Sequence, residues 1–130
     1  MSDPRQLGDL QLAILRVLWR QGEATAADVH EALLPERGLA PTTIATMLSK
    51  LEKRELVTHR TEGRQYIYRA TVAQEEARRS MVSEFVDRAF LGDPAALLNH
   101  LLTECDLGAE ELARLRRMIA DHKRGAGDRQ

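Results

Sequence analysis

The chain has 130 residues, of which 43% are hydrophobic and 30% are charged, which suits one domain with a core and excludes a disordered tail. No apolar run approaches the roughly 20 residues needed to cross a bilayer, and the N-terminus lacks the form of a signal peptide. We therefore expect a cytoplasmic protein with no direct membrane insertion. The single cysteine, Cys105, excludes an internal disulfide and a multi-cysteine metal cluster.

The net charge of −1 argues against a nucleic-acid partner when it is taken alone, but the charge is unevenly distributed. Residues 42–70 hold six basic and three acidic residues, whereas residues 1–41 and 71–130 each have a net charge of −2. Attraction to phosphate is screened over about 10 Å, so a local basic segment is sufficient. Residues 42–70 are therefore the candidate DNA-binding segment.

Two helices are predicted before this segment. Apolar residues at helical spacing predict the first over residues 7–20. Thr25, with an acid three positions later, has the form of a capping box and predicts a second helix that runs to about Leu34. Pro35 is predicted to end it. Between the two helices there is room for only a very short strand.

The candidate segment itself predicts a helix followed by a β-hairpin. The helix covers about residues 42–54, and the hairpin strands are Val57–Arg60 and Gln65–Ala70, joined by a turn over Thr61–Arg64. Three helices followed by a basic hairpin are typical of a winged helix-turn-helix. The predicted fold class is therefore mainly α with a small β-hairpin.

Side chains of this third helix that lie opposite its buried face form a row suited to a major groove. Its N-terminal threonines suit phosphate contact, because free backbone N–H groups favour anions there. Arg64, at the hairpin tip, is best placed to reach a minor groove. An ordinary solvated helix face is the alternative interpretation of the row. The predicted DNA-binding residues are Thr42, Thr43, Thr46, Met47, Lys50, Lys53, Arg60 and Arg64.

Three aromatic residues of the hairpin are given structural roles. Tyr66 and Tyr68 lie on one face of a strand, and at least one of them is predicted to pack onto the helices. His59 is predicted to be an exposed strand residue and not a ligand.

Three further helices are predicted after the hairpin. Thr71 is the expected N-cap of the first, Gly92-Asp93-Pro94 separates it from the second, and the third covers about residues 109–123. Their apolar stripes face no partner sheet, so we expect a second copy of the chain to cover them. The predicted dimerisation residues are Met81, Phe85, Leu97, Leu98, Leu101, Leu102, Leu112, Leu115 and Ile119.

The predicted organisation has three parts. Residues 1–70 form the winged helix-turn-helix DNA-binding domain, residues 71–124 the helical dimerisation region, and residues 125–130 a flexible tail. His100, Glu104, Cys105 and His122 are groups that zinc accepts, but their spacing matches no zinc motif. No metal site is therefore predicted. The sequence also lacks a phosphate loop and a nucleophile–base pair, so no cofactor and no catalytic residue is predicted.

Several segments together resemble the penicillinase-repressor family, which also includes methicillin-resistance repressors and copper-responsive relatives. They are LGDLQLAILRVLW, TAADVHEAL, PTTIATMLSKLEKRELV, GRQYIYRA and LGAEELARLRRMI, and the resemblance covers about residues 7–123. It implies a homodimeric bacterial repressor that binds a palindromic double-stranded DNA operator through the winged helix and pairs through the C-terminal helices.

The resemblance also implies two modes of regulation. Family members controlled by a membrane sensor metalloprotease are cut within the C-terminal helices, between an asparagine and a phenylalanine. The corresponding bond here is His100–Leu101, and neither residue matches that pattern. The copper-responsive branch carries paired C-terminal cysteines, whereas this chain has only Cys105, which excludes copper sensing by that route.

The leading hypothesis is thus a homodimeric transcriptional repressor that is released by proteolysis. One alternative is a winged-helix regulator whose C-terminal helices sense a small ligand or a metal, which would raise the melting temperature by mass action. Another is a winged-helix protein-interaction module without a DNA role. A steep salt dependence of DNA binding separates that module from a repressor.

Overall fold

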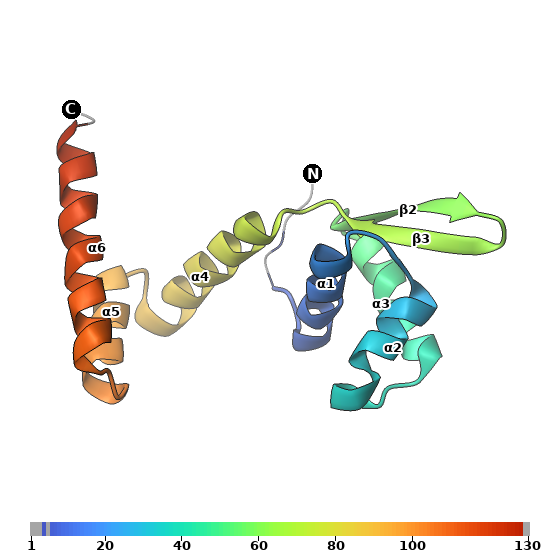
Figure 1. Ribbon diagram of the computed structural model, residues 1–130, viewed down its shortest axis with the longest axis horizontal. Coiled ribbons are helices and arrows are strands. Elements are labelled where there is room, and N and C mark those ends of the chain that lie inside the picture. Colours follow the sequence, from blue (N-terminus) through green and yellow to red (C-terminus); the bar gives the residue numbers. More distant parts are fainter. Residues whose placement is uncertain (1–3, 5, 129–130) are drawn as a thin grey trace.

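The structure is a computed structural model that describes residue 4 and residues 6–128, and it has an elongated shape (Figure 1). A winged-helix domain occupies one end, α4 leads away from it, and α5 and α6 lie at the other end. The helices are α1 (Asp9–Gln21), α2 (Ala26–Arg37), α3 (Pro41–Lys53), α4 (Gln74–Phe90), α5 (Pro94–Glu104) and α6 (Ala109–Asp128). The strands are β1 (Ala24–Thr25), β2 (Val57–Glu62) and β3 (Gln65–Ala70).

The hydrophobic core lies between α1, α2, α3 and the base of the sheet. Each helix contributes apolar residues at spacings of three and four, which place them on one face. Burial of each large aliphatic side chain contributes about 1.5–3 kcal/mol, so this cluster holds the three helices together. Its largest fully buried side chains are Ile14, Leu15, Leu18, Ile44, Leu48, Leu51, Leu56, Val17, Val29, Val57 and Val72.

The sheet is antiparallel and has the order β1-β3-β2. β2 pairs with β3 along its whole length, from Val57 opposite Ala70 to Glu62 opposite Gln65. The hairpin, hereafter the wing, is therefore two residues longer on its first strand than predicted. Tyr68 is buried against the core whereas Tyr66 is half exposed, so one tyrosine packs onto the helices as predicted.

The predicted end of α2 is wrong. α2 does not end at Pro35 but continues to Arg37, because a proline in the last turn removes only one backbone donor. Gly38, at a φ of 59°, then ends the helix and donates its N–H to the carbonyl of Leu34.

The predicted start of α4 is also wrong, because the N-cap is Ala73 and not Thr71. The hydroxyl of Thr71 instead donates to the carbonyl of Glu55, 2.7 Å away, and its N–H donates to the carbonyl of Leu56. The following residue, Val72, is buried in the core. These contacts hold Thr71 and Val72 outside the helix, so α4 begins later.

The C-terminal helices contribute little to this core. α4 buries Ala77 and Val86, and no residue of α5 is buried. α6 continues to Asp128 and so extends past the predicted end near residue 123. Of the predicted flexible tail, residues 129 and 130 lie outside the described residues.

Candidate nucleic-acid interface

The outer face of α3 carries the first group of predicted DNA-binding residues. Ile44, Leu48 and Leu51 are at most 1% exposed and anchor the opposite face in the core. Four predicted residues are exposed on the outer side, namely Thr42, Thr46, Lys50 and Lys53. The other two are half-buried, and one of them, Met47, packs against the core. Of the six, Thr43 and Met47 are thus less available to a ligand than the periodicity suggested.

The turn between α2 and α3 fixes the direction of that face. The Nε2–H of His30 donates to the carbonyl of Leu39 at 2.8 Å, across the turn. Pro41 occupies the first helical position, where a missing N–H costs nothing. Neither an acidic side chain nor a side-chain cap occupies the first turn of α3. This helix end therefore has the polarity that suits an anion such as phosphate.

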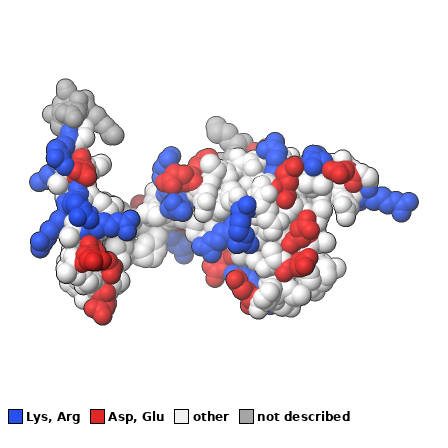
Figure 2. Space-filling view, viewed as in Figure 1, with Lys and Arg blue, Asp and Glu red and all other residues white. Residues whose placement is uncertain are grey.

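The wing places a second basic group beside α3. Gly63 turns the chain at a φ of 63°, and the exposed Arg64 follows it at the tip. Basic atoms project from the far end of the wing in Figure 2. Arg64 has no ion pair among the residues that the structure describes. The tip arginine is therefore available to an external phosphate.

Arg60, which was also predicted to contact DNA, lies in a different environment. Its Nε donates to Glu23 at 3.0 Å and one terminal nitrogen donates to Glu62 at 2.6 Å. A second terminal nitrogen donates to the other oxygen of Glu23 at 3.3 Å. The hydrogen bond from Arg60 lowers the pKa of Glu23, and the same two carboxylates raise the pKa of Arg60. The guanidinium is thus engaged on the protein itself.

His59 is half-buried and not exposed as predicted. Its Nδ1 lies 2.6 Å from Oε2 of Glu52 on α3, and its ring stacks on Tyr66 at a centroid separation of 4.0 Å. Burial, and then the charge of Glu52, raise the pKa of the neighbouring Tyr68. Sequence reasoning missed Glu23 and Glu52, because no local motif connects a carboxylate to a partner 37 or 7 residues away.

A separate apolar surface covers α4, α5 and α6, where the predicted dimerisation residues lie. Leu101, Leu102, Leu112 and Ile119 are between 36% and 49% exposed, and Phe85 is 52% exposed. The remaining predicted residues, Met81, Leu97, Leu98 and Leu115, are half-buried. None of these nine side chains is fully buried in one copy of the chain, and together they are hereafter called the uncovered stripe.

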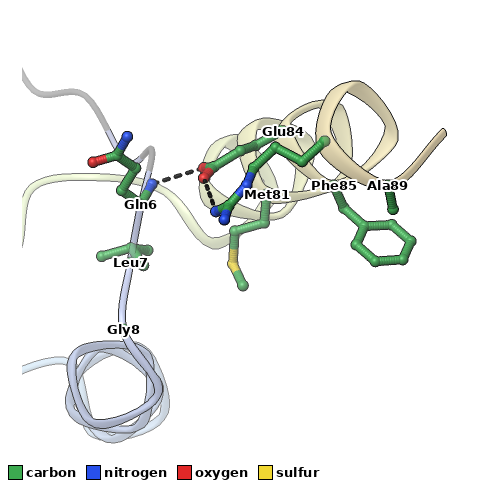
Figure 3. A pocket seen from close by; sticks show the side chains of 8 residues that line it. Gln6, Leu7, Gly8, Met81, Glu84, Phe85 and Ala89 are labelled. Atoms are coloured by element: carbon green, nitrogen blue, oxygen red, sulfur yellow. Dashed lines mark hydrogen bonds and ion pairs between the residues drawn. The ribbon is translucent and has the colours of Figure 1, made fainter. Parts of the chain in front are cut away.

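Two grooves lie along this apolar surface. The larger, of about 860 Å³, lies between the N-terminal segment at Leu7 and the side chains of Met81 and Phe85 on α4 (Figure 3). At its rim the backbone N–H of Gln6 donates to Glu84 at 2.7 Å. The smaller, of about 370 Å³, is lined by Leu98, Leu115, Met118, Ile119, His122 and Lys123.

The described residues contain neither a cluster that could bind a metal ion nor a helix that could span a membrane. No three His, Cys, Asp or Glu side chains within that part of the chain lie close enough together to hold a metal ion. Among the same residues, every helix is too short or too polar to cross a bilayer.

Comparison with known proteins identifies similar chains. The model of the penicillinase repressor family matches residues 7–121. The transcriptional regulator BlaI of Mycobacterium tuberculosis is 34% identical over 131 residues, which cover 99% of this chain and 94% of that protein.

Two solved structures resemble the winged-helix end of the molecule. The DNA-binding domain of the repressor BlaI is 28% identical, with a TM-score of 0.52 over 58% of this chain and 93% of that one. The monomeric form of Bacillus licheniformis BlaI in complex with the blaP half-operator is also 28% identical, with a TM-score of 0.50 and the same coverage.

Proposed function

Because the chain belongs to the penicillinase repressor family, we propose that it is a homodimeric transcriptional repressor that binds a palindromic DNA operator. The observation that carries this proposal is the exposed row on α3 next to a wing whose tip arginine has no ion pair among the described residues. The solved structure of a 28% identical BlaI in complex with a half-operator supports DNA as the ligand.

In this proposal α3 enters the major groove and the wing tip lies over the backbone or an adjacent minor groove. Lys50 and Thr46 would then contact base edges, since they lie near the middle of the exposed row. Thr42, Thr43 and Lys53 would contact phosphates at its ends, and Arg64 would do so from the wing. Met47 would add an apolar contact where it emerges from the core.

The uncovered stripe on α4, α5 and α6 supports the homodimer. Several large apolar side chains of these helices stay exposed in one copy, which is typical of a surface that contacts another protein. A two-fold axis would place the same stripe from two copies face to face, which is the usual geometry of a dimer. The two winged-helix domains related by that axis match an operator with inverted symmetry.

Release by proteolysis is the regulatory part of the proposal. His100 and Leu101 lie within α5, a helix with no buried residue in the single chain. A protease needs an extended substrate, so cleavage of this bond in the proposed dimer requires that α5 unfold locally away from the partner copy, which no buried residue of its own chain opposes. A cut there would separate the winged helix from α6. The proposed partner is a membrane sensor metalloprotease, as in the family members that are controlled by cleavage.

The test is selection of DNA by the protein itself. A pool of duplexes with 30 random base pairs is passed over the full-length chain at about 150 mM salt, and the retained fraction is sequenced through several rounds. We expect enrichment of an inverted repeat whose half-sites are about one or two helical turns apart. Binding of the enriched duplex should weaken steeply with salt. Enrichment of no sequence, or of a site without inverted symmetry, would contradict the proposal.

A further inference from the structure

The outer half of the wing lacks backbone support from the rest of the sheet. β1 pairs with β3 only at Ile67 and Tyr68, and towards the tip the two strands bond only to each other. An isolated two-stranded hairpin is marginally stable in water. Side-chain contacts are therefore needed to hold the tip, and with it Arg64, at a fixed distance from α3.

One such contact connects the wing to α3 through His59. The Nδ1–H of the histidine donates to the carboxylate of Glu52, and both side chains are about one-third exposed or less. On the wing, the imidazole lies almost parallel to the ring of Tyr66, at an interplanar angle of 14°. Tyr66 follows the tip residue Arg64 by two positions, so this contact reaches from α3 almost to the tip.

A second contact connects the wing to the segment before β1 through Arg60. Successive residues of a strand point to opposite faces, so Arg60 and His59 support the wing from different sides. Two nitrogens of the guanidinium bond to the two oxygens of Glu23, a geometry that fixes orientation as well as distance.

We propose that His59 and Arg60 are positioning residues, which set the wing tip relative to α3 through Glu52 and Glu23. This inference rests on the proposed DNA-binding function. It assigns to these residues a part of the discrimination between operator and random DNA, because base contacts by α3 and phosphate contacts by Arg64 form together only when their spacing is fixed. It also accounts for two carboxylates beside a surface that has to attract phosphate.

Charge and position predict opposite effects when these carboxylates are removed. Loss of a negative charge near the DNA strengthens binding to any sequence, since phosphate attraction does not depend on sequence. Loss of a positioning contact weakens binding to the operator alone.

The experiment compares Glu52→Gln with Glu52→Ala in the full-length chain. Both variants remove the charge, but the glutamine oxygen still accepts from His59 and the alanine does not. Dissociation constants are measured on the selected inverted-repeat duplex and on a random duplex of the same length. We expect the two variants to bind random DNA alike, and Glu52→Ala to bind the operator about five-fold more weakly than Glu52→Gln, the size of one lost hydrogen bond.

Glu23→Ala provides a second, independent arm on an exposed side chain, where loss of the fold is not expected. Positioning predicts that the ratio of operator to random affinity falls by about three-fold, consistent with the modest energy of an exposed pair, because loss of the charge strengthens binding to both duplexes alike. His59→Phe, which keeps the stack but cannot donate, should match Glu52→Ala in the ratio of operator to random affinity, and the double variant should have a ratio no lower than either. Melting curves of each variant establish that the chain remains folded.

Equal operator affinities for Glu52→Gln and Glu52→Ala, or a ratio of operator to random affinity that does not fall in Glu23→Ala, would overturn the positioning role. The wild-type chain, measured in the same series, tests the function separately. If it fails to bind either duplex in a salt-dependent way, the proposed function fails, whatever the variants do.

Discussion

Lys53 and Arg64 are exposed cations at two ends of the candidate DNA surface, one on α3 and one at the wing tip. Neither forms an ion pair with any residue that the structure describes. We expect Lys53→Ala and Arg64→Ala to weaken binding to operator and random DNA alike, and each to lower the slope of log affinity against log salt by about one. Titrations at several salt concentrations measure both effects, and Arg79→Ala on α4 is the control for loss of a remote charge.

Thr46 and Lys50 are expected to behave differently, because they lie at the middle of the exposed row. Thr46→Ala or Lys50→Ala should reduce the preference for operator over random DNA by roughly 1–3 kcal/mol, the value of a contact to a base edge. Competition binding with both duplexes measures this preference. If Thr46→Ala and Lys50→Ala, like Lys53→Ala and Arg64→Ala, lost affinity equally for both duplexes, α3 would not be the helix that recognises the base sequence.

Individual residues differ in how far the sequence determined their surroundings. The exposure of Lys50 and Lys53 followed from helical periodicity alone, since the buried stripe defines the opposite face. The engagement of His59 and Arg60 did not follow, because it depends on how the wing folds back towards α3 and β1. Alternation along a strand gives the face of a side chain and not its partner across the tertiary structure.

At the scale of helices and strands, the mainly α fold with its small sheet was predicted and is confirmed. The errors lie at the ends of elements, where single contacts decide between close alternatives. Thr71 has the side chain of an N-cap, but its hydroxyl donates to the carbonyl of Glu55, between α3 and β2. A sequence pattern shows that a side chain can cap a helix. It does not show whether a distant backbone group takes the same hydrogen bond.

The winged-helix core and the last two helices are nearly independent in what they bury, which leads to a prediction about α5. Every residue of the core cluster precedes α5. A chain that ends at His100 should therefore remain folded, sediment as a monomer and bind the operator only weakly, since each head then meets one half-site. Its far-UV circular dichroism should stay helical. Operator affinity similar to that of the full-length chain would exclude cleavage here as the means of release.

The elongated shape of the molecule sets the demands on any assembly. α5 and α6 lie away from the winged helix, so little of their apolar surface is covered within one copy (Figure 1). That surface was predicted from apolar spacing, and the structure leaves it uncovered. The partner that covers it is beyond both sequence and single-chain structure, so the homodimer stays a proposal.

Leu101→Asp tests this assembly. A carboxylate at the centre of the apolar stripe would be buried without a partner, at a cost of several kcal/mol, so we expect monomers and much weaker operator binding. Sedimentation velocity at micromolar concentration measures the association state. Asn99→Asp, which adds the same charge on an exposed polar position of α5, should leave the dimer intact. Wild-type chain that sediments as a monomer would be evidence against a dimeric repressor.

The uncovered stripe of α5 and α6 also affects how long the protein survives in a cell. In a dimeric repressor, each unpaired copy would present leucines and an easily unfolded helix to housekeeping proteases, whereas each paired copy would hide them. The rate of turnover per molecule would therefore fall as the protein accumulates. Once synthesis slows or pairs are broken, the degradation rate per molecule would rise as the concentration falls. The loss of repression would therefore accelerate as it proceeds.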